Sequence, residues 1–233
     1  MLHLVAVYAI LVAPPLGWMR YRRLLQAGFL DPGAKSRFYT RLVRGQCATL
    51  LALGVLWWLS GLPWSAVGVG PPHSWAITGA LVVWSAAVLF WSALRLRRRA
   101  ARVREVLKSR GGAILPDRPE QVPLFALACL WGGILEEFLY RGFMLDYLGR
   151  HIPRLTVLDG IILASLIFGL AHLYQGGRGV LTAGIVGLVL ALAYVGTGSL
   201  VAPALIHVMG NLRFVVLAQP AGGPPAQGPA RPG

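Results

Sequence analysis

Apolar residues dominate this chain in long runs, and short basic or Gly/Pro-containing segments separate the runs. A bilayer core is about 30 Å thick, so a helix needs roughly 20 mostly apolar residues to cross it. Seven runs approach that length and are predicted membrane helices: 2–19, 45–61, 74–94, 122–148, 156–174, 180–195 and 200–217. The pattern predicts an all-α fold, a polytopic membrane bundle of about seven helices in one domain over residues 1–217.

Prolines near the two ends of the chain predict two different structures, a kinked helix and a disordered tail. Pro14 and Pro15 interrupt the first apolar run, and no basic stretch precedes that run. We therefore expect a kinked membrane helix rather than a cleaved signal peptide. Residues 218–233 are rich in Pro and Gly, a composition typical of a disordered tail.

The overall composition excludes an ordinary water-soluble domain. Only 13% of residues are charged, whereas about 25% is usual in soluble proteins. The formal net charge of +14 comes mostly from arginines between the apolar runs, especially in 20–44 and 95–110. Such placement follows the positive-inside rule, so the expected partner is a lipid bilayer and not nucleic acid. The alternation of basic and non-basic loops predicts a multi-pass protein of the cell's inner (plasma) membrane, with the N-terminus outside and the C-terminus cytoplasmic.

Two cysteines, Cys47 and Cys129, lie in apolar stretches without metal-type spacing. Neither a structural disulfide nor a cysteine-ligated zinc ion is expected from them.

Ionisable side chains inside the apolar runs are concentrated in the last four. Such groups are costly at membrane depth and mark either function or a specific ion pair. Glu136 and Glu137 lie deep in the fourth run, and Arg141 follows. Glu137 and Arg141 are four residues apart and can pair on one helix face, while Glu136 points about 100° away. Taken alone, this motif is equally consistent with an ion pair that holds the bundle together.

The fifth and seventh runs add three further polar groups. His172 ends the fifth run, and Phe168 lies one turn earlier where it can pack on the imidazole. His207 and Asn211 are four apart in the seventh run and share a face. Alone, His172 is consistent with a histidine packed in the core. His207 and Asn211 are consistent with hydrogen bonds that hold two helices together. Together with the carboxylates they supply a base, a water-orienting imidazole and an oxyanion pocket, which are the parts needed to hydrolyse an amide.

The three motifs resemble the signatures of the CAAX-protease and bacteriocin-processing family of intramembrane peptidases, also called CPBP or Abi. That family's EExxxR, FxxxH and HxxxN signatures correspond here to 136–141, 168–172 and 207–211, in the same order and spacing. The resemblance covers residues 120–217, the expected peptidase core. The first three apolar runs resemble the family only in being hydrophobic.

The resemblance implies a glutamic-type intramembrane endopeptidase that needs no metal and no other cofactor. By position, Glu136 is expected to be the general base and His172 to orient the water. His207 and Asn211 are expected to stabilise the oxyanion. The remaining motif residues are expected to support the site: Glu137, Arg141 and Phe168.

The implied substrate is a membrane-associated or membrane-anchored protein or peptide, possibly cut near a C-terminal tail. Relatives trim prenylated tails, process bacteriocins or remove sorting anchors, and the sequence does not choose among these. A metalloprotease with Glu136, His172 and His207 as ligands stays open, although HExxH is absent. A non-enzymatic immunity or scaffold protein also stays open, whereas a transporter is disfavoured because no internal repeat is evident.

Overall fold

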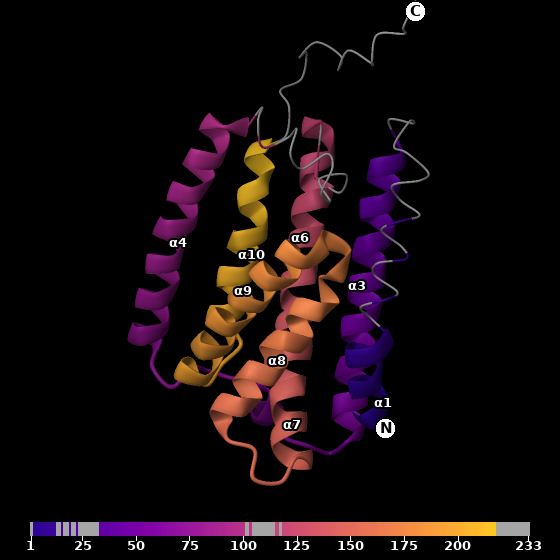
Figure 1. Cartoon of the computed structure of the whole chain (residues 1–233), viewed down its shortest axis with the longest axis vertical. Helices are drawn as coiled ribbons and strands as arrows, with labels where there is room; N and C mark the ends of the chain where they lie inside the picture. The colour runs from indigo at the N-terminus through magenta and orange to yellow at the C-terminus, as the bar shows by residue number, and fades with distance from the viewer. Residues whose placement is uncertain are drawn as a thin grey trace, which may run out of the picture.

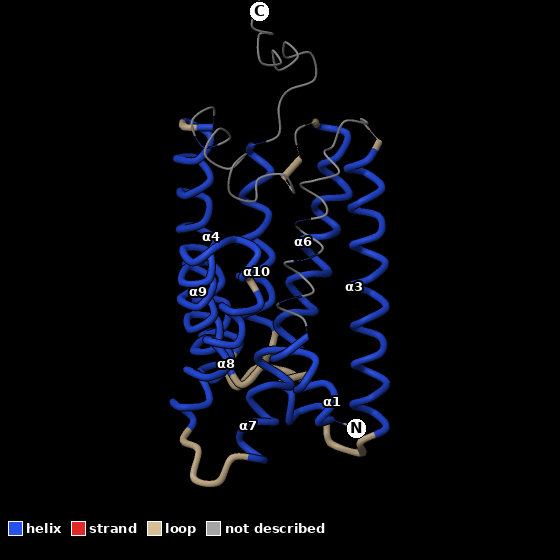
Figure 2. The backbone as a smooth tube through the Cα atoms, turned by 45° about the vertical axis from the view of Figure 1, so that its right-hand side comes forward, coloured by secondary structure: helices blue, strands red, loops and turns tan. Residues whose placement is uncertain are grey.

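The computed structural model describes residues 2–12, 33–100, 115–116 and 118–217, with the single positions 15, 19, 22 and 103. Every regular element in this part of the chain is helical, so the all-α prediction is confirmed. Figures 1 and 2 show the longer helices running side by side as a bundle. The α and π segments are α1 (Leu2–Val7), η1 (Tyr8–Val12), α3 (Ala34–Leu59), α4 (Trp75–Arg98), α6 (Val122–Glu137), η5 (Phe138–Met144), α7 (Leu145–His151), α8 (Val157–Ala171), α9 (Gly176–Thr197) and α10 (Val201–Leu212). Short 3-10 turns complete the order: η2 (Trp64–Val67), η4 (Pro119–Gln121), η6 (Leu173–Gln175) and η7 (Arg213–Leu217).

Each predicted apolar run contains at least one helix, but not every helix is long enough to cross a bilayer. Four are long and apolar enough by length and composition, namely Ala34–Leu59, Trp75–Arg98, Pro119–His151 and Leu173–Thr197. The shorter apolar helices are Leu2–Val12, Val157–Ala171 and Val201–Leu217. The predicted kink at Pro14 and the predicted disordered tail at 218–233 lie outside the described residues.

The predicted start of the second run at residue 45 is wrong, because α3 begins at Ala34. The hydropathy pattern assigns Lys35, Arg37 and Arg41 to a loop, whereas they form the first turns of the helix. Lys and Arg have good helix propensity. Arg37 and Arg41 are exposed at this helix end, whereas Lys35 is buried and donates to the carbonyl of Leu115 at 2.8 Å.

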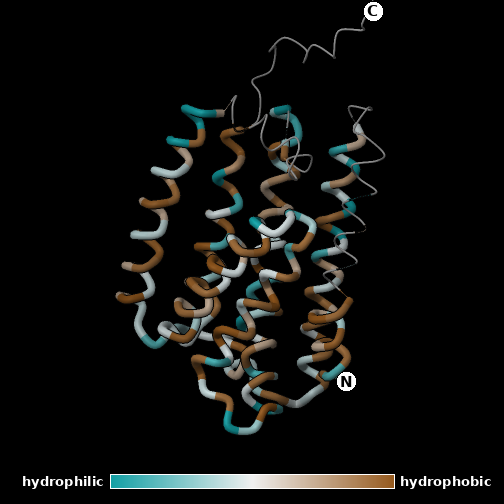
Figure 3. Tube along the Cα trace, viewed as in Figure 1, coloured by the Kyte–Doolittle hydropathy of each residue, from teal (hydrophilic) through white to brown (hydrophobic). Residues whose placement is uncertain are grey.

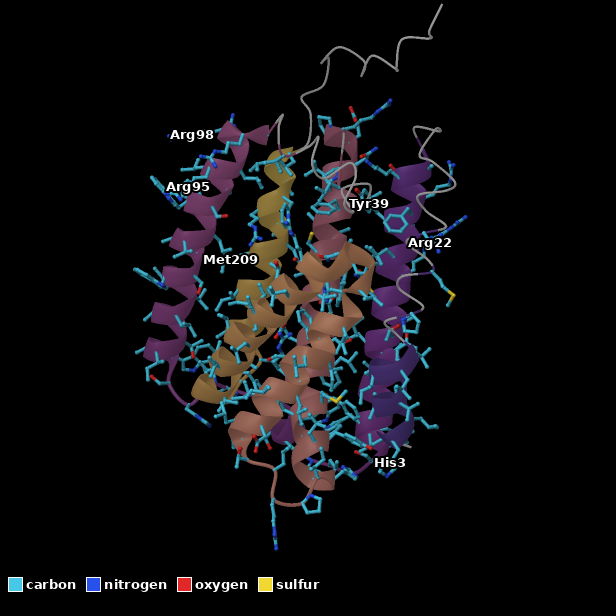
Figure 4. The ribbon with its side chains drawn as sticks, viewed as in Figure 1. His3, Arg22, Tyr39, Arg95, Arg98 and Met209 are labelled. Carbon is cyan, nitrogen blue, oxygen red and sulfur yellow. The ribbon has the colours of Figure 1, made fainter. Side chains whose placement is uncertain are left out.

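One end of the bundle is basic. The first turns of α3 and the last turn of α4 both lie at this end, and Figure 4 shows Arg95 and Arg98 there and His3 at the other end. Hydrophilic residues gather at the two ends in Figure 3, and hydrophobic ones fill the helices between them. We call the end that carries Arg95 and Arg98 the basic end. The start of α1 and the end of α10 lie at opposite ends of the bundle, as the predicted alternation requires (Figure 1).

The helix α8 is shorter than a membrane crossing. Its 15 residues span about 22 Å, less than the 30 Å of a bilayer core. A capping box between Thr156 and Asp159 starts the helix, and Gly176, with φ of 77°, turns the chain into α9. The turn between α8 and α9 consequently stops well short of the basic end, which α4 and α10 reach (Figures 1 and 2). The predicted full crossing over 156–174 is therefore wrong, because α8 by itself is too short.

Small residues let α8 and α9 approach closely. A Cβ atom on Gly169 would lie 2.9 Å from the carbonyl oxygen of Val180 and 3.3 Å from the Cα of Gly184. Both atoms belong to the backbone, so neither can rotate away. Close backbone approach through small residues is a common way for helices to associate in membranes.

Gly169→Ala is therefore expected to lower the free energy of unfolding by about 1–3 kcal/mol, because the helices must move apart. Gly196→Ala is the matched control, since a Cβ on that helical glycine would meet nothing within 4 Å. Thermal unfolding followed by circular dichroism in detergent micelles compares the two variants. Equal melting temperatures for both would contradict the close packing of α8 on α9.

Candidate active site

The two adjacent glutamates lie where α6 changes its winding. Glu136 and Glu137 end the α-helix, and the next seven residues, Phe138–Met144, form the π-helical segment η5. Segments of π-helix are rare and occur often at functional sites. The altered winding sets the direction of Arg141 relative to the carboxylates before it.

Glu137 and Arg141 form a fully buried ion pair, as predicted. The Nη1 atom of Arg141 is 2.7 Å from Oε1 of Glu137, and the side chains are 2% and 0% exposed, respectively. The guanidinium also donates through Nη2 to the carbonyl of Gly187 at 3.1 Å and lies 4.3 Å from the ring centroid of Phe168. Arg141 is therefore fixed by groups on three helical segments.

His207 on α10 joins this pair. Its Nδ1 lies 2.6 Å from the same Glu137 oxygen that accepts from Arg141. A carboxylate paired with arginine can only accept, so the proton of the imidazole is on Nδ1. The opposite nitrogen, Nε2, then faces Glu136, at 3.7 Å from Oε2. Glu137 thus sets both the tautomer and the direction of His207.

His172 is oriented in the same manner by the backbone. It is the C-cap of α8, and its Nδ1 lies 2.8 Å from the carbonyl oxygen of Phe168. A carbonyl oxygen only accepts, so Nδ1 donates, and Nε2 faces Oε2 of Glu136 at 3.9 Å. The ring of Phe168 packs on His172, with 4.6 Å between centroids, which agrees with the packing predicted from their spacing. The same ring lies edge-on to His207 at 5.9 Å.

Three polar atoms therefore converge at one point. Oε2 of Glu136 is buried and has no hydrogen-bond partner among the described residues. Its separations from the two Nε2 atoms, 3.7 and 3.9 Å, are too long for direct hydrogen bonds. Separations of this size suit a water molecule or a substrate group that contacts all three atoms.

Glu136 lines a cavity of about 280 Å³ that extends toward the basic end. Its polar lining includes Glu136, His172, His207 and Asn211, which are all four of the predicted catalytic residues. Asn211 lies one turn beyond His207 on α10, as its spacing predicts. The outer wall is mostly aromatic and comes from α3, α6 and η7: Phe38, Tyr39, Phe125 and Phe214. Figure 4 shows Tyr39 toward the basic end.

Two contributors to the site were not identified from the sequence. Gln46 of α3 lines the cavity, and it is a strongly polar residue in the second predicted run. Its amide carries no charge, so it does not stand out among the ionisable groups of the apolar runs. Gly187 supplies a carbonyl to Arg141, and a Cβ there would lie 3.1 Å from the Phe168 ring. A glycine in an apolar helix gives no comparable signal.

Residues 118–213 match the sequence model of the family described as Type II CAAX prenyl endopeptidase Rce1-like. The match includes the three motifs and leaves α1, α3 and α4 outside it. It confirms the family that the motif spacing predicts. No curated protein matches the chain, and no solved structure matches it.

Proposed function

We propose, from the premise that residues 118–213 are an Rce1-like domain, that this membrane protein is a glutamic-type intramembrane endopeptidase. Its substrate is a membrane-associated or membrane-anchored protein or peptide. The observation that carries the proposal is the convergence of Oε2 of Glu136 with Nε2 of His172 and Nε2 of His207 inside one cavity. A base and two orienting imidazoles aimed at one point are suited to activating water.

In this proposal a water molecule binds between Glu136 and His172. Glu136 accepts one proton as the water oxygen attacks the carbonyl carbon of the scissile bond. The carbonyl oxygen becomes an oxyanion, and the side-chain N–H of Asn211 donates to it. When the C–N bond breaks, the proton on Glu136 passes to the leaving amine, which balances the hydrolysis.

His207 supplies the second oxyanion donor when it is protonated. Its Nδ1–H then keeps the bond to Glu137, and its Nε2–H donates into the cavity. Glu137, Arg141 and Phe168 thus hold the catalytic groups and do not touch the reacting atoms.

The proposed orientation places the basic end in the cytoplasm at the inner (plasma) membrane, because Lys and Arg accumulate on that side. The cavity extends from Glu136 toward this end. The substrate segment accordingly enters from the cytoplasmic side.

A survey of protein termini by mass spectrometry tests the function in host cells that carry either the wild-type chain or Glu136→Gln. New termini that depend on Glu136 support a peptidase and identify its substrates. Identical termini, with both proteins present in the membrane at equal amounts, contradict it and favour the immunity or scaffold alternative.

Metal independence stays a prediction. The described residues contain no group of three or more His, Cys, Asp or Glu arranged to hold a metal ion. In the proposed mechanism protein side chains activate the water without a metal ion, so the chelators EDTA and 1,10-phenanthroline should change the hydrolysis rate by less than about twofold. If a chelator abolishes cleavage and zinc restores it, the alternative set of Glu136, His172 and His207 as ligands is supported instead.

A further inference from the structure

The side chain of Gln46, which lines the catalytic cavity, has an unused hydrogen-bond acceptor. Its Oε1 atom is buried without a hydrogen-bond partner among the described residues. The side chain lines the same cavity as Glu136, His172 and Asn211. Buried polar groups are normally paired, and an unpaired amide at membrane depth needs an explanation. A ligand that occupies the cavity would provide the missing partner.

The position of Gln46 relative to the reacting groups follows from its contact with α6. A Cβ on Gly132 would lie 2.7 Å from Nε2 of Gln46, so the carboxamide lies against that glycine. Gly132 precedes Glu136 by one helical turn on the same face, a distance of about 5–6 Å. An extended peptide advances about 3.3 Å per residue. For a peptide that runs along this face of α6, Gln46 therefore lies about one to two residues from the bond that Glu136 addresses.

We propose that Gln46 binds the backbone of an extended substrate peptide next to the scissile bond. A carboxamide offers one acceptor and one donor, which match the N–H and C=O groups of a peptide backbone. The assignment rests on the proposed peptidase function and adds a substrate-positioning residue from α3, which lies outside the Rce1-like domain. Because it binds main-chain atoms, Gln46 fixes the register of the substrate without selecting a particular side chain.

A backbone contact at this distance from the reacting atoms acts equally on the bound substrate and the transition state. Its loss should therefore appear in KM and not in kcat. Gln46→Leu keeps the approximate size of the side chain and removes both hydrogen-bonding groups. We expect KM to rise about tenfold and kcat to stay within about twofold of wild type.

The probe is a synthetic peptide that spans a cleavage site mapped by comparing termini from wild-type and Glu136→Gln cells. Kinetics are measured with the purified full-length protein in detergent micelles. Cys47→Ala is the matched control, because Cys47 follows Gln46 on α3 but lines a separate apolar groove with Trp58 and Trp64. This variant should leave both kinetic constants unchanged.

Gly132→Ala provides a second test that retains the glutamine. The added methyl group must displace the flexible carboxamide of Gln46, so KM should rise in the wild-type background. The same change should have no further effect on KM in the Gln46→Leu background. A KM for Gln46→Leu within twofold of wild type, or a fall in kcat alone, overturns the assignment while the peptidase proposal stands. Absence of any Glu136-dependent terminus overturns both.

Discussion

Glu136→Gln is expected to lower the rate of peptide hydrolysis about 10²- to 10⁴-fold, the contribution typical of a general base. The amide of glutamine has nearly the shape of the carboxylate but cannot accept the proton of the attacking water. Both imidazoles present Nε2 toward this one side chain and use Nδ1 elsewhere, so the carboxylate of Glu136 lies at the centre of the polar cluster. The fold should be unaffected, because Oε2 of Glu136 has no protein partner to lose among the described residues.

The measurement compares initial rates with the mapped peptide and thermal unfolding of the same preparations. Glu120→Gln is the matched control, since Glu120 is an exposed glutamate in η4 at the start of the same continuous helix. It should retain wild-type activity. Glu136→Gln with more than about a tenth of wild-type activity is incompatible with a general base at this position.

Glu137→Gln is expected to cause the largest loss of stability, about 3–5 kcal/mol in the free energy of unfolding. The guanidinium of Arg141 is only 2% exposed, and its carboxylate partner at 2.7 Å would lose its charge. The carbonyl of Gly187 and the face of Phe168 would remain around it, and neither carries a compensating charge. His207 would also lose the carboxylate that accepts from Nδ1.

Unfolding by SDS titration in mixed micelles measures this loss. The double variant Glu137→Gln, Arg141→Met removes both charges and should recover most of the stability. Arg150→Met is the control on the same helix, because the Asp146–Arg150 pair has the same spacing but Arg150 is 44% exposed. Breaking that pair should cost at most about 1 kcal/mol. A similar cost for the buried and the exposed pair would refute the role assigned to Glu137.

The sequence was sufficient for features that depend on periodicity within one helix. Apolar runs predict the bundle, and a spacing of four predicts the Glu137–Arg141 pair and the packing of Phe168 on His172. These contacts are local, so helical geometry alone determines them. The motif set also predicts which side chains share the cavity, but only through resemblance to a family.

Contacts between different helices could not be predicted from the hydropathy pattern or from the spacing of residues. The hydrogen bond from His207 to Glu137 joins residues that are 70 positions apart, and it depends on how α6 and α10 pack. Nothing in the chain before residue 118 matches the family, so the contribution of Gln46 could not be anticipated by analogy. The length of α8 was overestimated, because Leu173 and Tyr174 continue the apolar run although they form a 3-10 turn beyond the end of the helix.

The shortness of α8 bears on how a hydrolase can work in a membrane that maintains an ion gradient. Each cycle consumes one water molecule, which must reach Glu136 from one aqueous compartment. Since the α8–α9 turn stops short of the basic end, solvent needs to penetrate only part of the bilayer thickness from that side. The side chains of Phe138, Tyr140 and Phe143, which follow Glu136 along the chain, are buried in the apolar core. For the proposed peptidase we therefore expect water to reach Glu136 from the basic end alone, so that the bilayer stays impermeable to ions during turnover.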